Sequence, residues 1–298
     1  MTTLTTSNTS NKFKVGITHS GQFHADDVCS AWLLRKLNPE IKFTRVSRVP
    51  VDIEDDAIVF DIGLGKFDHH QPDRAVRPDG TPYAAFGLLW REFGNVLVNG
   101  NQDAFELFDR TYVLPIDAYD NGVKIGIDGP VLMFSVAVAT LNQNWDSNES
   151  PDKLFEDAIN WASFFLDRAL ESVMSKTRAK ALVEQAISKS TDGILVLEQF
   201  APWQEWVCTS TDPKAQNIMF CVYPSNRGGY VAQGVPKVLG QRGNRLDFPT
   251  AWRGLNPAEL AKITGVLDAE FCHMAGFIAG ASSKEGAIEL AKLAIAAN

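Results

Sequence analysis

Short apolar segments alternate with helical patterns in the first part of the chain, and this alternation limits the fold more than any other feature. Residues 13–18 (FKVGIT) have the length and composition of a buried strand, and residues 25–37 carry apolar side chains at helical spacing. A second apolar run, residues 57–60 (AIVF), is continuous, as in strands buried on both faces. Strands alternating with helices predict a parallel sheet with right-handed crossovers. We therefore expect an N-terminal α/β domain.

Polar residues follow the predicted strands closely. His19 comes after the first strand, Asp61 directly follows the apolar run at 57–60, and His69 comes soon after Asp61. Ligands of open α/β sheets bind outside the carboxyl ends of the strands. These three side chains are therefore expected to share one site.

The chain has 5 histidines, and all but one of them lie in two short acidic blocks. The blocks are residues 19–27 (HSGQFHADD) and 68–70 (DHH). Burying consecutive polar groups is costly unless each finds a partner, and metal coordination supplies such partners. Imidazole together with carboxylate suits Mn²⁺, Zn²⁺ or Fe, and Mg²⁺ where carboxylates predominate. The pattern predicts a metal-dependent phosphoesterase that holds two ions about 3.5–4 Å apart.

Each of these residues also has a structural alternative when it is considered singly. Asp61 and Asp120 can cap turns, and Asp68 can be a solvated surface charge. Because side chains alternate along an extended segment, Asp68 and His70 should face one way and His69 the other. We therefore expect one histidine to bind metal, its neighbour to contact substrate, and Asp68 to orient a ligand.

Composition sets broad limits on location and partners. The net charge of -8 argues against non-specific binding of long nucleic acids. The longest apolar stretch, residues 131–141, falls far short of the roughly 20 residues that span a bilayer. The 4 cysteines include no C-x-x-C pair, which indicates reduced thiols. These features favour a cytoplasmic protein with no membrane partner.

The chain is expected to have four segments. Residues 1–11 are rich in Ser and Thr, lack a targeting pattern, and are predicted to be a disordered tail. Residues 12–145 are expected to form the metal-binding catalytic domain, and 146–191 a helical connector. Residues 192–298 contain several strand patterns and are expected to form a smaller α+β domain that binds substrate.

Five strings in this sequence resemble the melanocyte-proliferating-gene exonuclease family, which lies within the DHH phosphoesterase superfamily. They are residues 18–27 (THSGQFHADD), 67–71 (FDHHQ), 116–122 (IDAYDNG), 252–255 (WRGL) and 273–280 (HMAGFIAG). They run in the family's order and cover nearly the whole chain. The resemblance implies an N-terminal DHH-type domain, a smaller C-terminal domain that closes over the substrate, and 3′–5′ exonuclease activity, especially on RNA.

The resemblance also implies roles for individual residues. Two divalent ions, Mn²⁺ or alternatively Mg²⁺, would be bound by His19, His24, Asp26, Asp61, His69 and Asp120. His70 and Asp68 would form the catalytic pair, and Asp27 and Asp117 would support the ligands, although either Asp117 or Asp120 could be the direct ligand. Substrate binding in the C-terminal domain would involve His273, Arg253, Gly276 and Gly280.

Two positions depart from the expected pattern. His24-Ala25-Asp26 stands where the wider superfamily usually has Asp-x-Asp, which bears on the metal that the site prefers. Ala279 stands where the family commonly has glycine, which bears on how closely the backbone can approach a substrate.

Three functions are compatible with these residues. The first is a two-metal exonuclease acting on RNA or short oligonucleotides, with Asp61 as a bridge between the ions. The second keeps the site but takes pyrophosphate, a dinucleotide or a nucleotide. The third is a non-catalytic regulatory protein with a structural metal, although structural sites are usually closed by four protein ligands. A homo-oligomer stays open.

Overall fold

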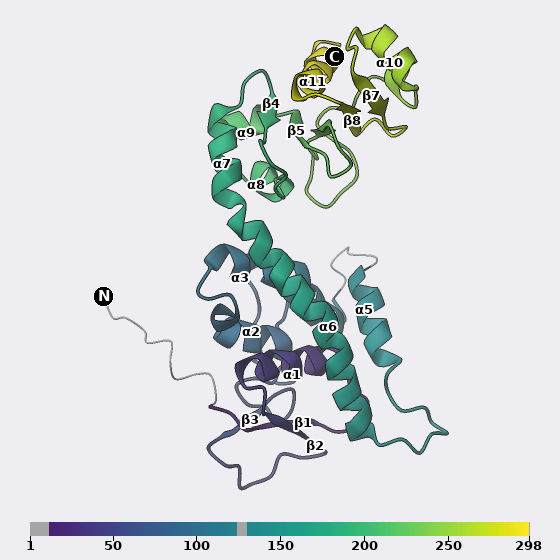
Figure 1. Ribbon diagram of the computed structural model, residues 1–298. Coiled ribbons are helices and arrows are strands. Elements are labelled where there is room, and N and C mark those ends of the chain that lie inside the picture. The colour runs from purple at the N-terminus through teal and green to yellow at the C-terminus, as the bar shows by residue number, and fades with distance from the viewer. Residues whose placement is uncertain (1–11, 124–129, 298) are drawn as a thin grey trace, which may run out of the picture. The chain divides into compact units, whose positions relative to one another are not determined.

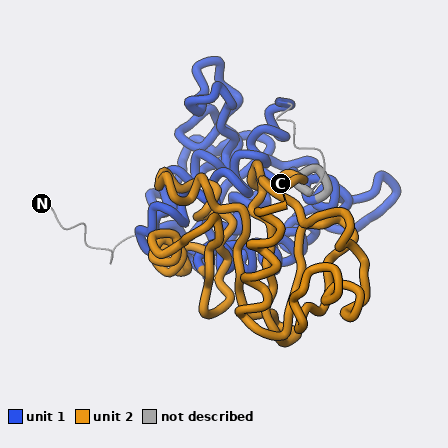
Figure 2. Tube along the Cα trace, turned by 90° about the horizontal axis from the view of Figure 1, so that it is seen from above, with its two compact units in different colours: residues 1–174 blue, residues 175–298 orange. Residues whose placement is uncertain are grey.

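The computed structural model describes residues 12–123 and 130–297, so the tail expected over residues 1–11 lies outside the described residues. The chain divides into two compact units, unit 1 (Met1–Met174) and unit 2 (Ser175–Asn298), which Figure 2 colours separately. The division falls inside helix α6 (Pro151–Arg178), in the segment 146–191 where a helical connector was expected. A second helix, α7 (Lys180–Lys189), completes that segment.

Unit 1 contains a three-stranded parallel sheet, as the sequence predicts. Its strands are β1 (Val15–His19), β2 (Lys42–Val46) and β3 (Ala57–Val59), in the order β2-β1-β3. His19 is the last residue of β1 and lies opposite Val46 of β2. Asp61 follows the end of β3 by two residues. The carboxyl ends of the strands therefore bring His19 and Asp61 to one edge of the sheet.

Helices cover the sheet and complete unit 1 (Figure 1). Helix α1 (Ala25–Leu37) has the bounds that the apolar spacing predicts, and α6 runs beside it, where Trp32 Nε1 donates to Asp167 Oδ1 at 2.9 Å. The other elements are α2 (Ala85–Leu97), α3 (Gln102–Phe108), a π-helical turn (Asp109–Val113), α4 (Leu114–Asp120) and α5 (Pro130–Ala139).

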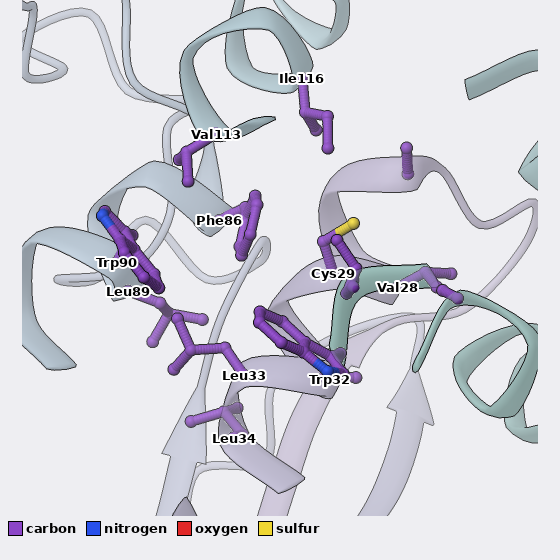
Figure 3. Close-up of a cluster of buried hydrophobic side chains, with 14 of the residues drawn as sticks. Val28, Cys29, Trp32, Leu33, Leu34, Phe86, Leu89, Trp90, Val113 and Ile116 are labelled. Carbon is purple, nitrogen blue, oxygen red and sulfur yellow. The ribbon is translucent and has the colours of Figure 1, made fainter. Parts of the chain in front are cut away.

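The core of unit 1 lies between α1, α2 and the turn that leads into α4 (Figure 3). Trp32 and Trp90 are both almost fully buried, and each stacks on Phe108, with ring centroids 5.9 and 4.5 Å apart. Large aromatic side chains in close contact provide much of the burial that fixes helix positions. This core holds the first turns of α1 and α2 and the end of α4 where the site residues lie.

Unit 2 is built on a five-stranded mixed sheet in the order β4-β5-β6-β8-β7. The strands are β4 (Ile194–Val196), β5 (Phe220–Pro224), β6 (Tyr230–Gly234), β7 (Ala269–Cys272) and β8 (Ile278–Ala281); only β4 and β5 pair in parallel. Its remaining helices are α8 (Gln204–Cys208), α9 (Pro213–Asn217), a 3₁₀ turn (Thr250–Trp252), α10 (Pro257–Thr264) and α11 (Lys284–Ala296). The protein is thus α/β in unit 1, with a mixed sheet and helices in unit 2.

Two further observations concern the chain as a whole. Within residues 12–123 and 130–297, no helix combines the length and apolar content that crossing a bilayer requires. All 4 cysteines are free thiols, and Cys29, Cys221 and Cys272 are buried.

Candidate active site

Asp61 lies between two histidines that come from different parts of the chain. Its Oδ2 is 3.3 Å from His19 Nε2, and its Oδ1 is 3.1 Å from His69 Nε2. Burial alone would raise the pKa of Asp61, but hydrogen bonds from the two imidazoles outweigh it and lower the pKa to about 2. Each carboxylate oxygen therefore faces a different imidazole, an arrangement suited to a carboxylate that bridges two cations.

A tight loop returns the chain from Asp61 to the second histidine block. Asp61, Gly63 and Leu64 all have positive φ, of 55°, 89° and 57°, and Asp61 N donates to Phe67 O at 2.9 Å. Aspartate tolerates this left-handed backbone better than most residues. A Cβ on Gly63 would lie 2.7 Å from the Val49 side chain, so the loop requires glycine there.

Asp68 organises the residues on either side of it. Its Oδ1 accepts from His70 Nδ1 and from the His69 amide, both at 2.7 Å, and its Oδ2 accepts from the Leu64 amide at 2.6 Å. Burial raises the pKa of Asp68, but the hydrogen bond from His70 and those from the backbone outweigh it and lower the pKa. Asp68 and His70 thus contact each other, and His69 contacts Asp61. The predicted alternation is wrong, because residues 68–70 form no strand: the rings of His69 and His70 lie 4.3 Å apart, and His70 Nδ1 is 3.9 Å from Asp61 Oδ1.

His69 is oriented by residues at the end of α4. Its Nε2 is 3.3 Å from Asp120 Oδ2, and its Nδ1 is 3.4 Å from Asn121 Oδ1. The Asn121 carboxamide is fixed, because its Nδ2 donates to Tyr83 O at 3.3 Å and to Asp117 O at 2.8 Å. An oxygen facing Nδ1 favours the tautomer with its proton there. Nε2, which lies between Asp61 and Asp120, is then the atom that would bind a metal ion.

The first histidine block adds a third carboxylate to the site. Asp27 Oδ2 accepts from the His24 amide at 2.8 Å and lies 3.3 Å from His19 Nε2. His24 Nδ1 lies 4.0 Å from Asp120 Oδ1, so this block meets the end of α4. The Oδ1 atom of Asp27 is buried and has no hydrogen-bond partner among the described residues. A buried anionic oxygen without a partner is costly, and a cation would satisfy it.

Asp26 serves a helix as well as the cluster. Its side chain is fully buried, and its oxygens accept from the amides of Ala85 and Phe86 at 3.0 and 2.7 Å. Those amides open α2, whose own N-cap residue, Ala84, makes no side-chain cap bond. A carboxylate at this position satisfies unpaired N–H groups and opposes the positive end of the helix dipole.

Asp117 points away from the histidines, toward Arg77. Its Oδ2 is 2.7 Å from Arg77 Nη2, and its Oδ1 accepts from the Gly87 amide at 3.0 Å. Burial raises the pKa of Asp117 to about 7 despite the charge of Arg77. A Cβ on Gly87 would overlap the Asp117 carboxylate, so α2 and α4 can pack this closely only with glycine. Asp117 belongs to none of the ligand groups found among the described residues.

Three groups of side chains in unit 1 could hold metal ions, and two of them share His69. Within each group the ligand atoms lie within 4.8 Å of one another, and the groups are His19, His24 and Asp27; Asp61, His69 and His70; and Asp26, His69 and Asp120. Hydrogen bonds to Asp27 and Asp61 raise the pKa of His19 to about 11. Burial and then the charge of Asp61 raise the pKa of Asp26 and of Asp120. Divalent cations would replace the protons that this cluster otherwise retains, so the residues fit a metal centre.

The site opens into a cavity of about 790 Å³ that is lined by the four histidines of the two blocks. Gln22, Arg74 and Asn121 also line it, and none of the three was assigned a role from sequence. Asn121 could have been suspected, since it follows Asp120 directly. Arg74 offered no sequence signal beyond its position shortly after the DHH string.

The C-terminal candidates lie in unit 2 and are occupied by local contacts. Arg253 Nε and Nη2 donate to Phe248 O at 3.0 and 2.9 Å, and its guanidinium lies where a Cβ on Gly276 would be. His273 Nδ1 accepts from the Ala275 amide at 3.0 Å. Arg253, His273 and Gly276 share one turn region.

Gly280 lies apart from that turn, in the middle of β8. The ring of Phe271 on the neighbouring strand β7 covers it and leaves no room for a side chain there. The structure thus gives this glycine a packing reason within the sheet.

Comparison with known proteins places the chain among relatives of similar length. A model of the family MYG1_exonuc, described as "Uncharacterised protein family (UPF0160)", matches residues 15–295. The MYG1 protein YER156C of Saccharomyces cerevisiae is 31% identical over 94% of this chain and 95% of its own length. The MYG1 exonucleases of mouse and human are 29% and 28% identical over 94% of this chain and 84% and 85% of theirs. No solved structure gives a significant match.

The family match extends over both units and includes all five strings on which the resemblance rests. That resemblance is therefore confirmed, and the chain is a member of the MYG1_exonuc family.

Proposed function

We propose that the protein is a metal-dependent 3′–5′ exonuclease that hydrolyses RNA or short oligonucleotides. The observation that carries this proposal is the position of Asp61, whose two oxygens face His19 and His69 separately. In sites that hydrolyse phosphodiesters with two metals, one carboxylate usually spans both ions. The mouse and human relatives are named exonucleases, which supports the same reaction class.

We propose that two ions share Asp61. One would be held by His19, His24 and Asp27, and the other by Asp26, His69 and Asp120. The mixture of imidazole and carboxylate suits Mn²⁺ better than Mg²⁺, which prefers oxygen ligands. When bound, divalent ions supply Lewis acidity toward the phosphate and lower the pKa of water.

His70 is the residue best placed to move a proton. The Nδ1 atom of His70 lies 2.7 Å from Asp68 Oδ1. The His70 side chain is 58% exposed and lines the cavity. A carboxylate on Nδ1 orients the ring, so that Nε2 can pass a proton to the oxygen that leaves phosphorus. Hydrolysis would then break the bond between phosphorus and the 3′ oxygen and release a nucleoside 5′-monophosphate.

The two units would have separate roles, catalysis and substrate binding, as the domains of DHH-type proteins do. Unit 1 would be the catalytic domain, and unit 2 would bind substrate through the turn that holds Arg253, His273 and Gly276. Arg253 uses Nε and Nη2 on Phe248 O, which leaves Nη1 for a phosphate.

A substrate panel tests the proposal directly. The purified protein is incubated with Mn²⁺, Mg²⁺ or EDTA and with 5′-labelled single-stranded RNA, the matching DNA, a dinucleotide or pyrophosphate. We expect Mn²⁺-dependent shortening of the RNA from its 3′ end, one nucleotide at a time, with none in EDTA. Turnover of pyrophosphate or dinucleotides alone would instead establish a phosphohydrolase on the same site.

The number and exchange of bound metal ions separate catalysis from a structural role. Two exchangeable ions per chain, counted by elemental analysis after dialysis against Mn²⁺, are expected. One zinc ion that survives dialysis against EDTA, without turnover of any substrate, would point to a regulatory protein instead.

A further inference from the structure

The cavity beside the histidine cluster contains a guanidinium for which the metal proposal has no use. Its lining carries three carboxylates, and Arg74 is the one lysine or arginine among the described residues that line it. Arg35, Arg45 and Arg77 each pair with a carboxylate. In the described part of the chain, Arg74 forms no such ion pair. Its charge is therefore available to an anion in the cavity.

Arg74 is held by the same atom that orients His69. Its Nη1 donates to Asn121 Oδ1 at 2.8 Å, and that oxygen lies 3.4 Å from His69 Nδ1. Asn121 cannot turn away, because its amide nitrogen is bound to the carbonyls of Tyr83 and Asp117. The guanidinium is thus tied to the metal-facing imidazole through one fixed carboxamide.

We propose that Arg74 binds the non-bridging oxygens of the substrate phosphate and that Asn121 positions it relative to His69. This inference rests on the proposed function and names a group that recognises the phosphate at the same site. A guanidinium has five N–H donors in a planar fork, and Asn121 occupies one of them, which leaves an edge for bidentate contact. Without this charge, the carboxylates of the cavity would oppose the entry of a phosphate.

Binding measurements on the full-length protein test the role of Arg74. The probe is a short fluorescein-labelled RNA with phosphorothioate linkages, titrated in Mn²⁺ and followed by anisotropy. Arg74→Ala should weaken RNA binding about 10- to 100-fold, the range for a charge-assisted contact. Arg74→Lys should fall between, because lysine keeps the charge but not the fork.

Lys42→Ala is the matched control. Lys42 is an exposed cation at the first residue of β2, at the opposite end of the strand from Val46, which pairs with His19. The Lys42→Ala substitution removes one positive charge from unit 1, as Arg74→Ala does. It should change RNA affinity by less than about twofold, because an exposed charge away from the site contributes little.

Mn²⁺ titration by calorimetry separates the two residues. Arg74→Ala should bind Mn²⁺ as the unmodified protein does, whereas Asn121→Ala should weaken both RNA and Mn²⁺ binding, because it releases His69 as well. Equal RNA affinity in Arg74→Ala and the unmodified protein would overturn the inference, and so would a parallel loss of Mn²⁺ in Arg74→Ala.

Inorganic pyrophosphate is the second probe, and it keeps this inference distinct from the proposed function. If the unmodified protein neither binds nor cleaves RNA, the nuclease proposal fails. Loss of Mn²⁺-dependent pyrophosphate binding in Arg74→Ala would still support the phosphate role of Arg74. Unchanged pyrophosphate binding in that variant would refute it.

Discussion

The histidine cluster of unit 1 and the turn around Arg253 in unit 2 use charged side chains in opposite ways. In unit 1, His69 Nε2 lies 3.1 Å from Asp61 and 3.3 Å from Asp120, so the cluster gathers charge that a ligand must balance. In unit 2, two N–H groups of Arg253 donate to the Phe248 carbonyl, so its charge already has a partner. Concentrated, imperfectly balanced charge is typical of a chemical centre, whereas satisfied charge is typical of scaffolding that can also contact a ligand.

The largest effect that would sharpen this comparison is expected from Asp61→Asn. Asparagine keeps the shape and tolerates the positive φ of 55° at this position, but it removes the charge between the two imidazoles. Mutation of residues that hydrogen-bond to metal ligands lowers activity by up to about 100-fold. Because Asp61 is proposed to be a ligand itself, we expect the rate of cleavage in Mn²⁺ to fall by at least about 100-fold. Asp55→Asn, at an exposed position before β3, is the control. Near-normal turnover in purified, folded Asp61→Asn would refute a bridging role.

Metal binding should stabilise unit 1 and leave unit 2 unaffected. At 100 times its dissociation constant, a ligand specific for the native state adds about 2.7 kcal/mol to the free energy of unfolding. For a unit of this size, the melting temperature would rise by roughly 5–11 °C. Hydrogen exchange with Mn²⁺ or EDTA should show added protection in α1, α2 and α4. Equal protection of the unit 2 sheet would contradict the contrast drawn here.

Gly87→Ala should destabilise unit 1 through the packing behind the cluster. The new methyl group would overlap the Asp117 carboxylate, which bonds both Arg77 and the Gly87 amide. Overpacking of this kind costs about 1–3 kcal/mol in the free energy of unfolding. Chemical denaturation measures the change, with Gly65→Ala as the control because a Cβ there meets nothing within 4 Å. A midpoint equal to that of the control would show that the contact is easily relieved.

The smallest effect is expected in unit 2, from Arg253→Ala. Loss of two hydrogen bonds from a partly exposed guanidinium should cost about 1 kcal/mol in the free energy of unfolding. If Arg253 binds the substrate equally well in the ground state and in the transition state, its loss should raise KM by up to about tenfold while kcat stays constant. Steady-state kinetics on RNA gives both values. A fall in kcat like that of Asp61→Asn would place the chemistry in both units and break the comparison.

Much of the candidate site could be predicted from sequence because strand ends determine where side chains go. His19 and Asp61 follow parallel strands, so their convergence needed few assumptions. Strand alternation did not predict the arrangement of residues 68–70, where the rings of His69 and His70 lie side by side. The supporting contacts could not be predicted. Asp26 bonds amides 59 and 60 positions away, a pairing that depends on how two helices pack.

The same limit applies to the fold. The bounds of α1 agree with its apolar spacing, although the helix is buried on all sides over residues 25–34, which that spacing did not predict. The segment 154–187 reads as one amphipathic stretch, yet the structure has two helices with Ala179 between them. Strand β8 carries only small side chains and Ile278. The ring of Phe271 covers Gly280, and Ala279 and Ala281 belong to the core that includes α11, so tertiary packing rather than an apolar pattern explains its burial.

The bond between Asp26 and the start of α2 has a consequence for how firmly the site retains a metal. The amides at the start of α2 donate to the Asp26 carboxylate, and the positive end of the helix dipole offsets part of its negative charge. A cation bound beside Asp26 is therefore attracted less strongly than it would be by three carboxylates without such partners. An ion held in this way would come and go with supply. The protein would then be active only when enough metal is available, and a shortage of metal would be sufficient to inactivate it.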